Sequence, residues 1–176
     1  MRSIRSFLGM AEERPAEAES DSVRAIVSQL EQLPPERARF VAAFGYILSR
    51  AARADLEIRD EEHRAMQALL VEHAGLSAPQ AELVVELARL HNAMLGGTDN
   101  FLVTREFDRV ATREQKLALL HCLFVVGAAD GAVTAAEDHV IRRIADELHL
   151  EHRDFIAVRS RFLQHLAVLR PQQPPD

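Results

Sequence analysis

Residues 127–150 read GAADGAVTAAEDHVIRRIADELHL, and this stretch decides the fold. The pair Asp130-Gly131 ends one apolar helical pattern, and a second pattern follows it with apolar residues at every third or fourth position. Thr134 and Glu137 have the spacing of a capping box, in which two side chains bind the free backbone N–H groups at a helix start. The stretch therefore predicts a helix, an acidic turn and a second helix.

An earlier part of the chain repeats this pattern without gaps. ARADLEIRDEEHRAMQALL, residues 52–70, aligns on residues 127–145 with a constant offset of 130 − 55 = 75. The alignment places acidic residues on acidic residues, Asp55 on Asp130 and Glu62 on Glu137. Apolar residues recur at helical spacing through the rest of the chain, and no segment alternates with period two. We expect an all-α bundle of about seven or eight helices, built from two helix-turn-helix halves related by a pseudo-twofold axis.

Composition and charge limit the classes of function. The chain has 176 residues, enough for one domain with a real core, and its net charge of 21 − 27 = −6 argues against nucleic-acid binding. The single Cys122 lies in an apolar helical run, which indicates a buried, reduced thiol and a cytoplasmic protein. No apolar run approaches the roughly 18 residues of a membrane span, so we expect no stable membrane insertion.

Changes of composition predict the domain limits. Residues 1–21 read as an N-terminal segment and flexible linker, residues 22–169 as the helical domain, and residues 170–176, RPQQPPD, as a disordered tail. The last helix should end near Leu169, and residues 98–110 form a short helix or an irregular crossover. The N-terminal residues combine arginines with apolar side chains, which favours docking on the protein's own bundle and permits weak peripheral membrane contact.

Two motifs resemble a known family. AADGAVTAAEDHVIRRIADELHLEHRDFIAVRSRFL, from Ala128, is similar to the C-terminal half of the tellurite-resistance protein B (TerB-like) family, and RADLEIRDEE, from Arg53, resembles the family's first copy of the turn. The resemblance extends from about Phe40 to Leu166. It implies a non-enzymatic bacterial helical bundle, linked to stress response and tellurite resistance, whose acidic turns bind a divalent cation. The first turn departs from the pattern, because Leu56 stands where the second has Gly131.

The residues themselves leave two interpretations of the turns open. Counted along an EF-hand loop, Asp130 and Glu137 fall on the fifth and twelfth positions, but Val126 and Ala128 supply no ligand at the first and third. A complete EF-hand is therefore excluded. The acidic residues could still bind a divalent cation, Ca²⁺ in preference, at a site of four carboxylates: Asp55, Glu62, Asp130 and Glu137. Alternatively Glu137 only caps its helix.

Other polar residues carry weaker hypotheses. His63 and His139 are out of register in the repeat, which argues against a ferritin-like two-metal centre and favours surface histidines. His121 beside Cys122 is expected to be a hydrogen-bonded core histidine, because no third orienting residue for a catalytic pair is identifiable. Two functions follow. One is a non-enzymatic, cation-responsive protein with a protein partner, and the other is a metal-independent helical interaction module.

Overall fold

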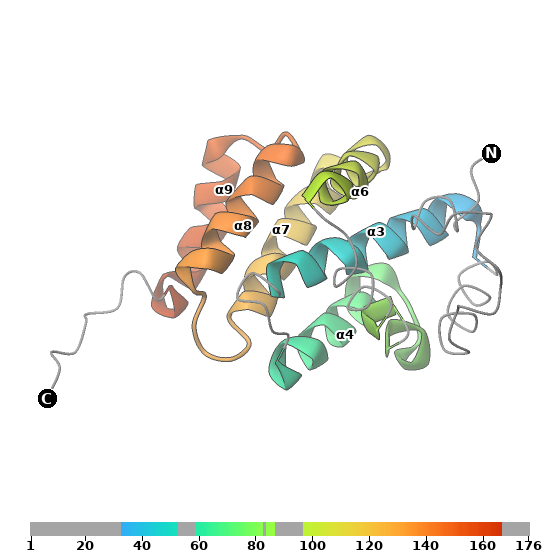
Figure 1. Ribbon diagram of the computed structural model, residues 1–176, viewed down its shortest axis with the longest axis horizontal. Coiled ribbons are helices and arrows are strands. Elements are labelled where there is room, and N and C mark those ends of the chain that lie inside the picture. The colour runs from blue at the N-terminus through green and yellow to red at the C-terminus, as the bar shows by residue number, and fades with distance from the viewer. Residues whose placement is uncertain (1–32, 53–58, 83, 87–96, 167–176) are drawn as a thin grey trace, which may run out of the picture.

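The computed structural model describes residues 33–52, 59–82, 84–86 and 97–166. Within these ranges the chain is helical, apart from turns and one isolated bridge between Val133 and Leu166, so the predicted all-α class is confirmed. The helices assemble into one bundle, shown in Figure 1. They are α3 (Pro35–Ala52), α4 (Asp60–Ala74), α6 (Gly97–Val110), α7 (Arg113–Gly127), α8 (Ala135–Glu147), α9 (His152–Arg159) and the 3-10 helix η2 (Ser160–His165), and residues 78–82 and 84–86 are also helical.

Helix α3 is the centre of the bundle. Every residue from Val41 to Ala52 is buried, and the helix packs against α4, α6, α7 and α8. A helix that is apolar around most of its circumference must be covered on all sides, which explains this position. Gly45 permits the closest approach, because a Cβ atom there would lie only 2.4 Å from Cγ1 of Val84. The helical residues 84–86 therefore lie directly against α3.

A buried ion pair fastens α3 to two other helices. Nη1 and Nη2 of Arg50 donate to the Glu147 carboxylate of α8 at 2.8 and 3.2 Å, and Nη1 also donates to the Thr104 hydroxyl of α6. The Arg50 side chain is only 7% exposed. A charge buried this deeply is tolerated when it is both paired and hydrogen-bonded, as it is here.

Reciprocal capping bonds begin two of the described helices. The Thr112 hydroxyl accepts from the Gln115 backbone N–H at 3.3 Å, and the Gln115 side chain accepts from the Thr112 N–H at 2.7 Å. Ser77 and Gln80 form the same reciprocal pair at the start of the next helix after α4. Gly75, with φ of +62°, ends α4 in the left-handed conformation. The short connection of residues 75–77 therefore places α4 beside the helical residues 78–82.

The structure decides one open expectation and changes another. Residues 97–110 form a helix, α6, which is the first of the two predicted alternatives. The last helix does not continue to Leu169: it is α-helical to Arg159, becomes 3-10 in η2 and ends at His165. The His165 carbonyl accepts from the Val133 N–H at 2.7 Å, and Leu166 is fully buried beside it. The helix ends here because the His165 carbonyl bonds to Val133 and Leu166 adopts an extended, buried conformation.

Several predictions lie outside the described residues. They concern the N-terminal segment and linker, the C-terminal tail, and the first turn with Asp55 and Leu56. The pseudo-twofold relation of the two halves stays a prediction. In the described part of the chain no helix has the length and apolarity needed to cross a membrane.

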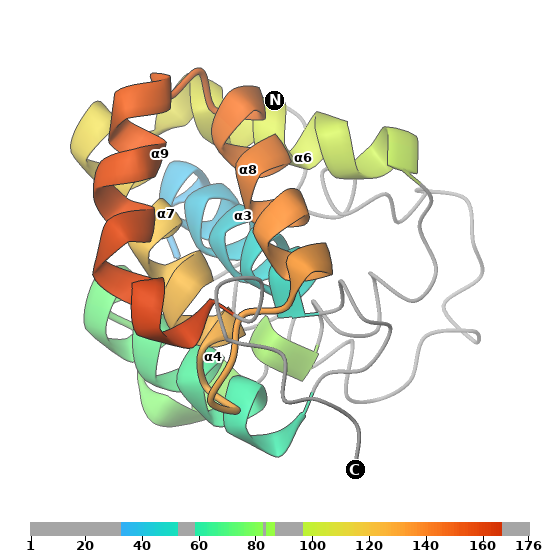
Figure 2. The ribbon, with the colours of Figure 1, turned by 90° about the vertical axis from the view of Figure 1, so that its left-hand side faces the viewer.

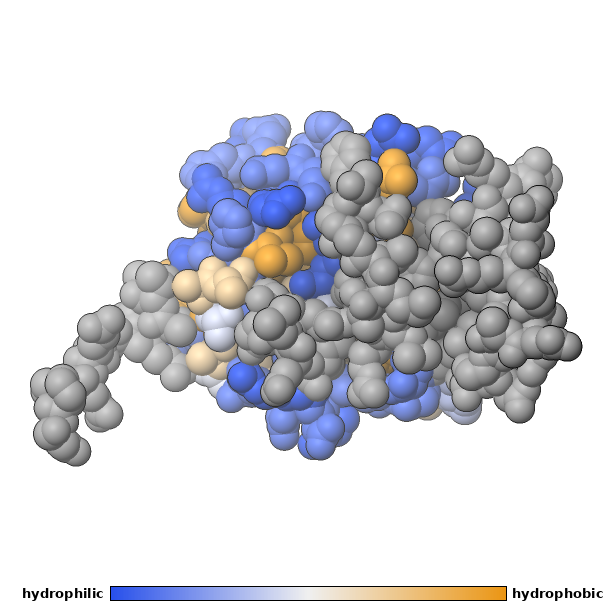
Figure 3. Space-filling view, viewed as in Figure 1, coloured by the Kyte–Doolittle hydropathy of each residue, from blue (hydrophilic) through white to orange (hydrophobic). Residues whose placement is uncertain are grey.

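The described surface is mostly hydrophilic. Figure 3 shows one face on which polar residues dominate and apolar residues occupy small areas. Among the described residues, the large apolar side chains that are exposed come from three different α-helices and from η2: Val71, Leu102, Val110, Ile156 and Leu163. Apolar residues scattered in this way are ordinary on protein surfaces and do not by themselves indicate a docking site.

Candidate functional site

The turn between α7 and α8 is stabilised by hydrogen bonds between residues close in sequence. Oδ1 of Asp130 accepts from the Ala132 N–H at 3.2 Å, and the Gly131 N–H donates to the Ala128 carbonyl at 3.0 Å. Gly131 has φ of +104°, a conformation that side chains with a Cβ rarely adopt. The Asp-Gly pair is therefore required by the shape of this turn, whether or not it binds an ion.

Glu137 closes the turn from the α8 side. Its Oε2 accepts from the Thr134 N–H at 2.7 Å, and its own N–H donates to the Thr134 hydroxyl at 3.1 Å, so the predicted capping box is confirmed. The residue is only 3% exposed. Its carboxylate lies against the end of α7, where a Cβ on Gly127 would come within 3.4 Å of Oε1. Glu137 is thus a buried carboxylate, an uncommon state for this residue type.

Glu62 has the same local geometry at the start of α4. Its Oε2 accepts from the Arg59 N–H at 2.7 Å, and the residue is 2% exposed. The positions correspond through the offset found in the sequence, since 137 − 62 = 75 and 134 − 59 = 75. Two buried glutamates therefore perform the same capping role in the two halves. Arginine lacks an acceptor, so the reciprocal side-chain bond made by Thr134 has no counterpart at Arg59.

A contact across the repeat joins the two halves at this end. Nη1 of Arg59, at the start of α4, donates to Oδ2 of Asp130 in the other turn. The Arg59 side chain is 45% exposed and that of Asp130 21% exposed, so the pair lies at the rim of the bundle. Figure 2 shows the turn between α7 and α8 beside α4, as this contact requires. The second acidic turn thus meets the beginning of the first half's second helix.

The four predicted ligands differ in burial and in whether the structure describes them. Glu62 and Glu137 are buried beneath their helix starts, and Asp130 is at the rim in contact with Arg59. Asp55 lies outside the described residues. All three described side chains offer the hard carboxylate oxygens that Ca²⁺ prefers, and a carboxylate retains acceptor sites after accepting one N–H. Metal binding by this set stays a prediction.

Comparison with known proteins assigns the chain to a family. The family model described as Tellurite resistance protein TerB matches residues 41–160, more than half of the chain. The chain belongs to the TerB family. No curated protein and no solved structure gives a match. The region that matches TerB extends from α3 to the end of α9, so it includes Glu62, Asp130 and Glu137.

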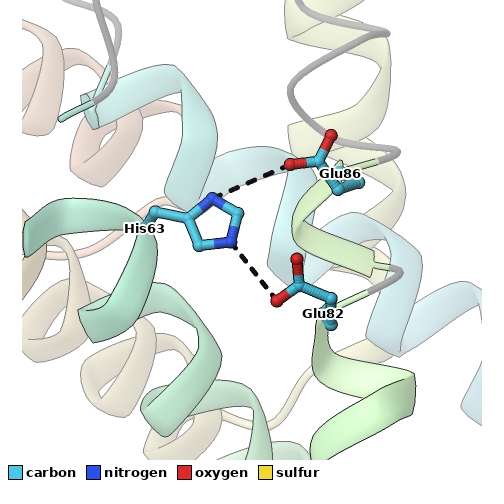
Figure 4. A group of neighbouring side chains, drawn as sticks. All are labelled: His63, Glu82 and Glu86. Atoms are coloured by element: carbon cyan, nitrogen blue, oxygen red, sulfur yellow. Dashed lines mark hydrogen bonds and ion pairs between the residues drawn. The ribbon is translucent and has the colours of Figure 1, made fainter. Parts of the chain in front are cut away.

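The TerB region also contains a group of potential ligands that the sequence did not indicate. His63 of α4 faces Glu82 and Glu86, which belong to the helical residues 78–82 and 84–86, as Figure 4 shows. Its Nε2 lies 3.4 Å from Oε2 of Glu82, and its Nδ1 lies 3.9 Å from Oε1 of Glu86. The four-residue spacing of the two glutamates was visible in the sequence. Their meeting with His63 depends on how two helices pack.

His121 and Cys122 do not form a reactive pair in this TerB chain. Burial raises the pKa of the Cys122 thiol to about 12, so the thiol stays protonated at neutral pH. His121 was expected to be hydrogen-bonded, but its buried Nδ1 has no partner among the residues that the structure describes. The ring instead packs 5.3 Å from that of Phe162, measured between centroids. An aromatic contact, rather than a hydrogen bond at Nδ1, is therefore the interaction that the structure describes for this ring.

Proposed function

We propose that this TerB-family protein is a non-enzymatic, cation-responsive protein, with a divalent ion bound between its two acidic turns. The ligands would be the four predicted carboxylates: Asp55, Glu62, Asp130 and Glu137. The contact between Arg59 and Asp130 supports this proposal most directly, because it brings an acidic turn of one half to the helix start of the other. The buried Glu62 and Glu137 add two further carboxylates, at the starts of α4 and α8.

The ion and Arg59 compete for the same carboxylate. Arg59 already supplies positive charge to Asp130, which is the kind of compensation that neighbouring carboxylates need. A divalent ion at this end takes over that role and releases the guanidinium from Asp130. Ca²⁺ is the favoured ion, because all the proposed ligands are hard oxygen atoms and Ca²⁺ accepts flexible coordination.

The release of Arg59 connects ion binding with partner binding. The side chain is partly exposed in the ion pair, so its new position changes the charge and shape of the bundle's rim. We propose that a protein partner recognises this rim, in the cytoplasm of a bacterial cell under stress. The name of the family, tellurite resistance protein, suggests the kind of stress. Loss of tellurite tolerance in a deletion strain that Asp130→Asn fails to complement would support this role.

Calorimetric titration with Ca²⁺ tests the proposal. The full-length chain should bind the ion, and Asp130→Asn should weaken binding by removing a ligand charge. Arg59→Gln should tighten binding, because it removes the competing guanidinium while leaving the backbone N–H that Glu62 accepts from. Equal Ca²⁺ affinities for the wild type and both variants, or no binding by the wild type, would reject the proposal.

One observation favours the alternative function. Glu62 and Glu137 each accept a backbone N–H at a helix start, and Asp130 accepts from both Ala132 and Arg59. Capping and pairing of this kind require no ion. The alternative is a metal-independent helical interaction module whose acidic turns are only structural. Its stability and its partner binding would then be the same in chelator and in Ca²⁺.

A further inference from the structure

A second group of side chains, between α4 and the helical residues that follow it, has a different chemistry from the acidic turns. His63 lies between Glu82 and Glu86, and one ligand atom from each residue can be chosen so that all three lie within 4.8 Å of one another. Figure 4 shows both carboxylates directed at the imidazole from the neighbouring helix. We propose that His63, Glu82 and Glu86 form a separate site for a borderline transition-metal ion of the Zn²⁺ class.

The spacing of the three residues suits such an ion. Glu82 and Glu86 are four residues apart in the sequence and belong to the helical residues 78–82 and 84–86, and both carboxylates face His63. Tetrahedral Zn²⁺ with bonds of about 2.0–2.2 Å separates its ligand atoms by about 3.3–3.6 Å. The Nε2 to Glu82 distance of 3.4 Å already has this value. Because one ion binds one ring nitrogen and Glu86 lies 3.9 Å from Nδ1, the proposal requires the partly exposed Glu86 side chain to rotate toward Nε2.

The combination of ligands selects the class of ion. Zn²⁺ binds both histidine nitrogen and glutamate oxygen, and an open Zn²⁺ site has three protein ligands with water in the fourth position. An imidazole nitrogen is a poor ligand for Ca²⁺ and Mg²⁺, which prefer oxygen. The exposure of the side chains is also suitable: His63 is 20% exposed and held by packing, while Glu82 and Glu86, at 47% and 36%, leave the site open to solvent.

The corresponding position in the second half shows what a purely structural clamp looks like. The residue equivalent to His63 is Asp138, since 138 − 63 = 75. Asp138 is bonded by both its oxygens to Arg159 of α9, at 2.8 and 2.9 Å. That pair matches one negative with one positive charge. At His63, two carboxylates face one imidazole, so these three groups have a net negative charge even when the imidazole is protonated. The two groups thus differ in their ligand atoms, since only the His63 group offers an imidazole nitrogen together with two carboxylates.

Substitution of His63 by arginine separates the metal site from an ion-pair clamp. The variant His63→Arg keeps a positive charge between the two glutamates but removes the nitrogen ligand. Glu82→Gln removes one carboxylate charge and leaves the imidazole in place. His73→Gln is the matched control, because His73 is on the same helix and also lies beside a glutamate, with 3.9 Å between Nε2 and Oε1 of Glu72. Asp130→Asn is the control for the acidic turns.

The measurement is titration of the full-length chain with Zn²⁺ by calorimetry, and with Co²⁺ by visible absorption. We expect one ion per chain, bound about tenfold or more weakly by His63→Arg and by Glu82→Gln. His73→Gln and Asp130→Asn should bind it like the wild type. Thermal unfolding without metal should show that His63→Arg is folded. Absence of Zn²⁺ binding by the wild type, or equal binding by a folded His63→Arg, would overturn the proposal and leave the group as an ion-pair clamp.

Discussion

Glu62 and Glu137 are buried carboxylates that bind the backbone in the same way, 75 residues apart. Each accepts, through Oε2 and at 2.7 Å, the N–H of the residue three positions before it. Each is less than 4% exposed. A carboxylate this deeply buried is costly unless hydrogen bonds or cations compensate it. The two glutamates are therefore the structural anchors of the acidic end, and any ion at this end binds on top of their capping role.

Substitution of Glu137 should separate capping from charge. Glu137→Ala removes the acceptor of the Thr134 N–H and should lower the free energy of unfolding by about 1–3 kcal/mol. Glu137→Gln keeps an acceptor oxygen and should cost clearly less. Urea denaturation of both variants in chelator measures the difference. Glu61→Gln, at an exposed position of α4, is a suitable control and should change stability little. Equal losses for the alanine and glutamine variants would show that charge, not capping, is what matters here.

The two glycines around the second turn should respond differently to alanine. Gly131→Ala places a Cβ at φ of +104°, where nothing crowds it but the backbone itself is strained, and should cost about 1–2 kcal/mol. Gly127→Ala, at the end of α7, places a Cβ at ordinary contact distance from Glu137 and should be tolerated. Thermal unfolding of the two variants compares them directly. If Gly127→Ala is the more destabilising change, the fit between Glu137 and α7 is tighter than described.

His121 should make stability depend on pH. Burial, assisted by the charge of Arg161, holds the pKa of His121 below its usual value of 6.5. The unfolded chain therefore binds a proton on this residue at a higher pH than the folded chain does. The contribution of His121 to stability is fully present above pH 6.5 and is lost as the pH falls from 6.5 toward the folded pKa.

The variant His121→Gln isolates this contribution from the other histidines. Between about pH 7.5 and about pH 5.5, the free energy of unfolding should fall more steeply for the wild type than for the variant. Urea denaturation at several pH values gives both slopes. Parallel slopes would mean that His121 has the same pKa in the folded and unfolded chains.

Local features of this structure could be predicted from the sequence. The capping boxes at Thr112 and Thr134 depend on residues three positions apart, so the sequence contains both partners of each hydrogen bond. The buried state of Cys122 follows from the apolar residues around it in its helix. The same reasoning explains the all-α class, because apolar spacing determines which face of each helix is covered.

Contacts between distant residues could not be predicted in this way. Arg59 and Asp130 are 71 residues apart, and nothing in either local pattern indicates that they meet. His63 was interpreted as a surface histidine. Its meeting with Glu82 and Glu86 could not be predicted, because it depends on how their helical residues pack against α4. The early end of the last helix likewise depends on a hydrogen bond from Val133, which belongs to a distant turn.

Thermal unfolding with and without Ca²⁺ tests the proposed cation response most directly. An ion bound only by the folded chain stabilises it by about 2.7 kcal/mol at a hundredfold excess over the dissociation constant. The wild type should therefore melt at a higher temperature in Ca²⁺ than in chelator. Asp130→Asn should lose most of this gain, and should lose no more than about 1 kcal/mol in chelator, because its partly exposed ion pair with Arg59 contributes little. A wild-type melting temperature that is the same in chelator and in saturating Ca²⁺ would contradict the proposal and identify the acidic turns as capped turns only.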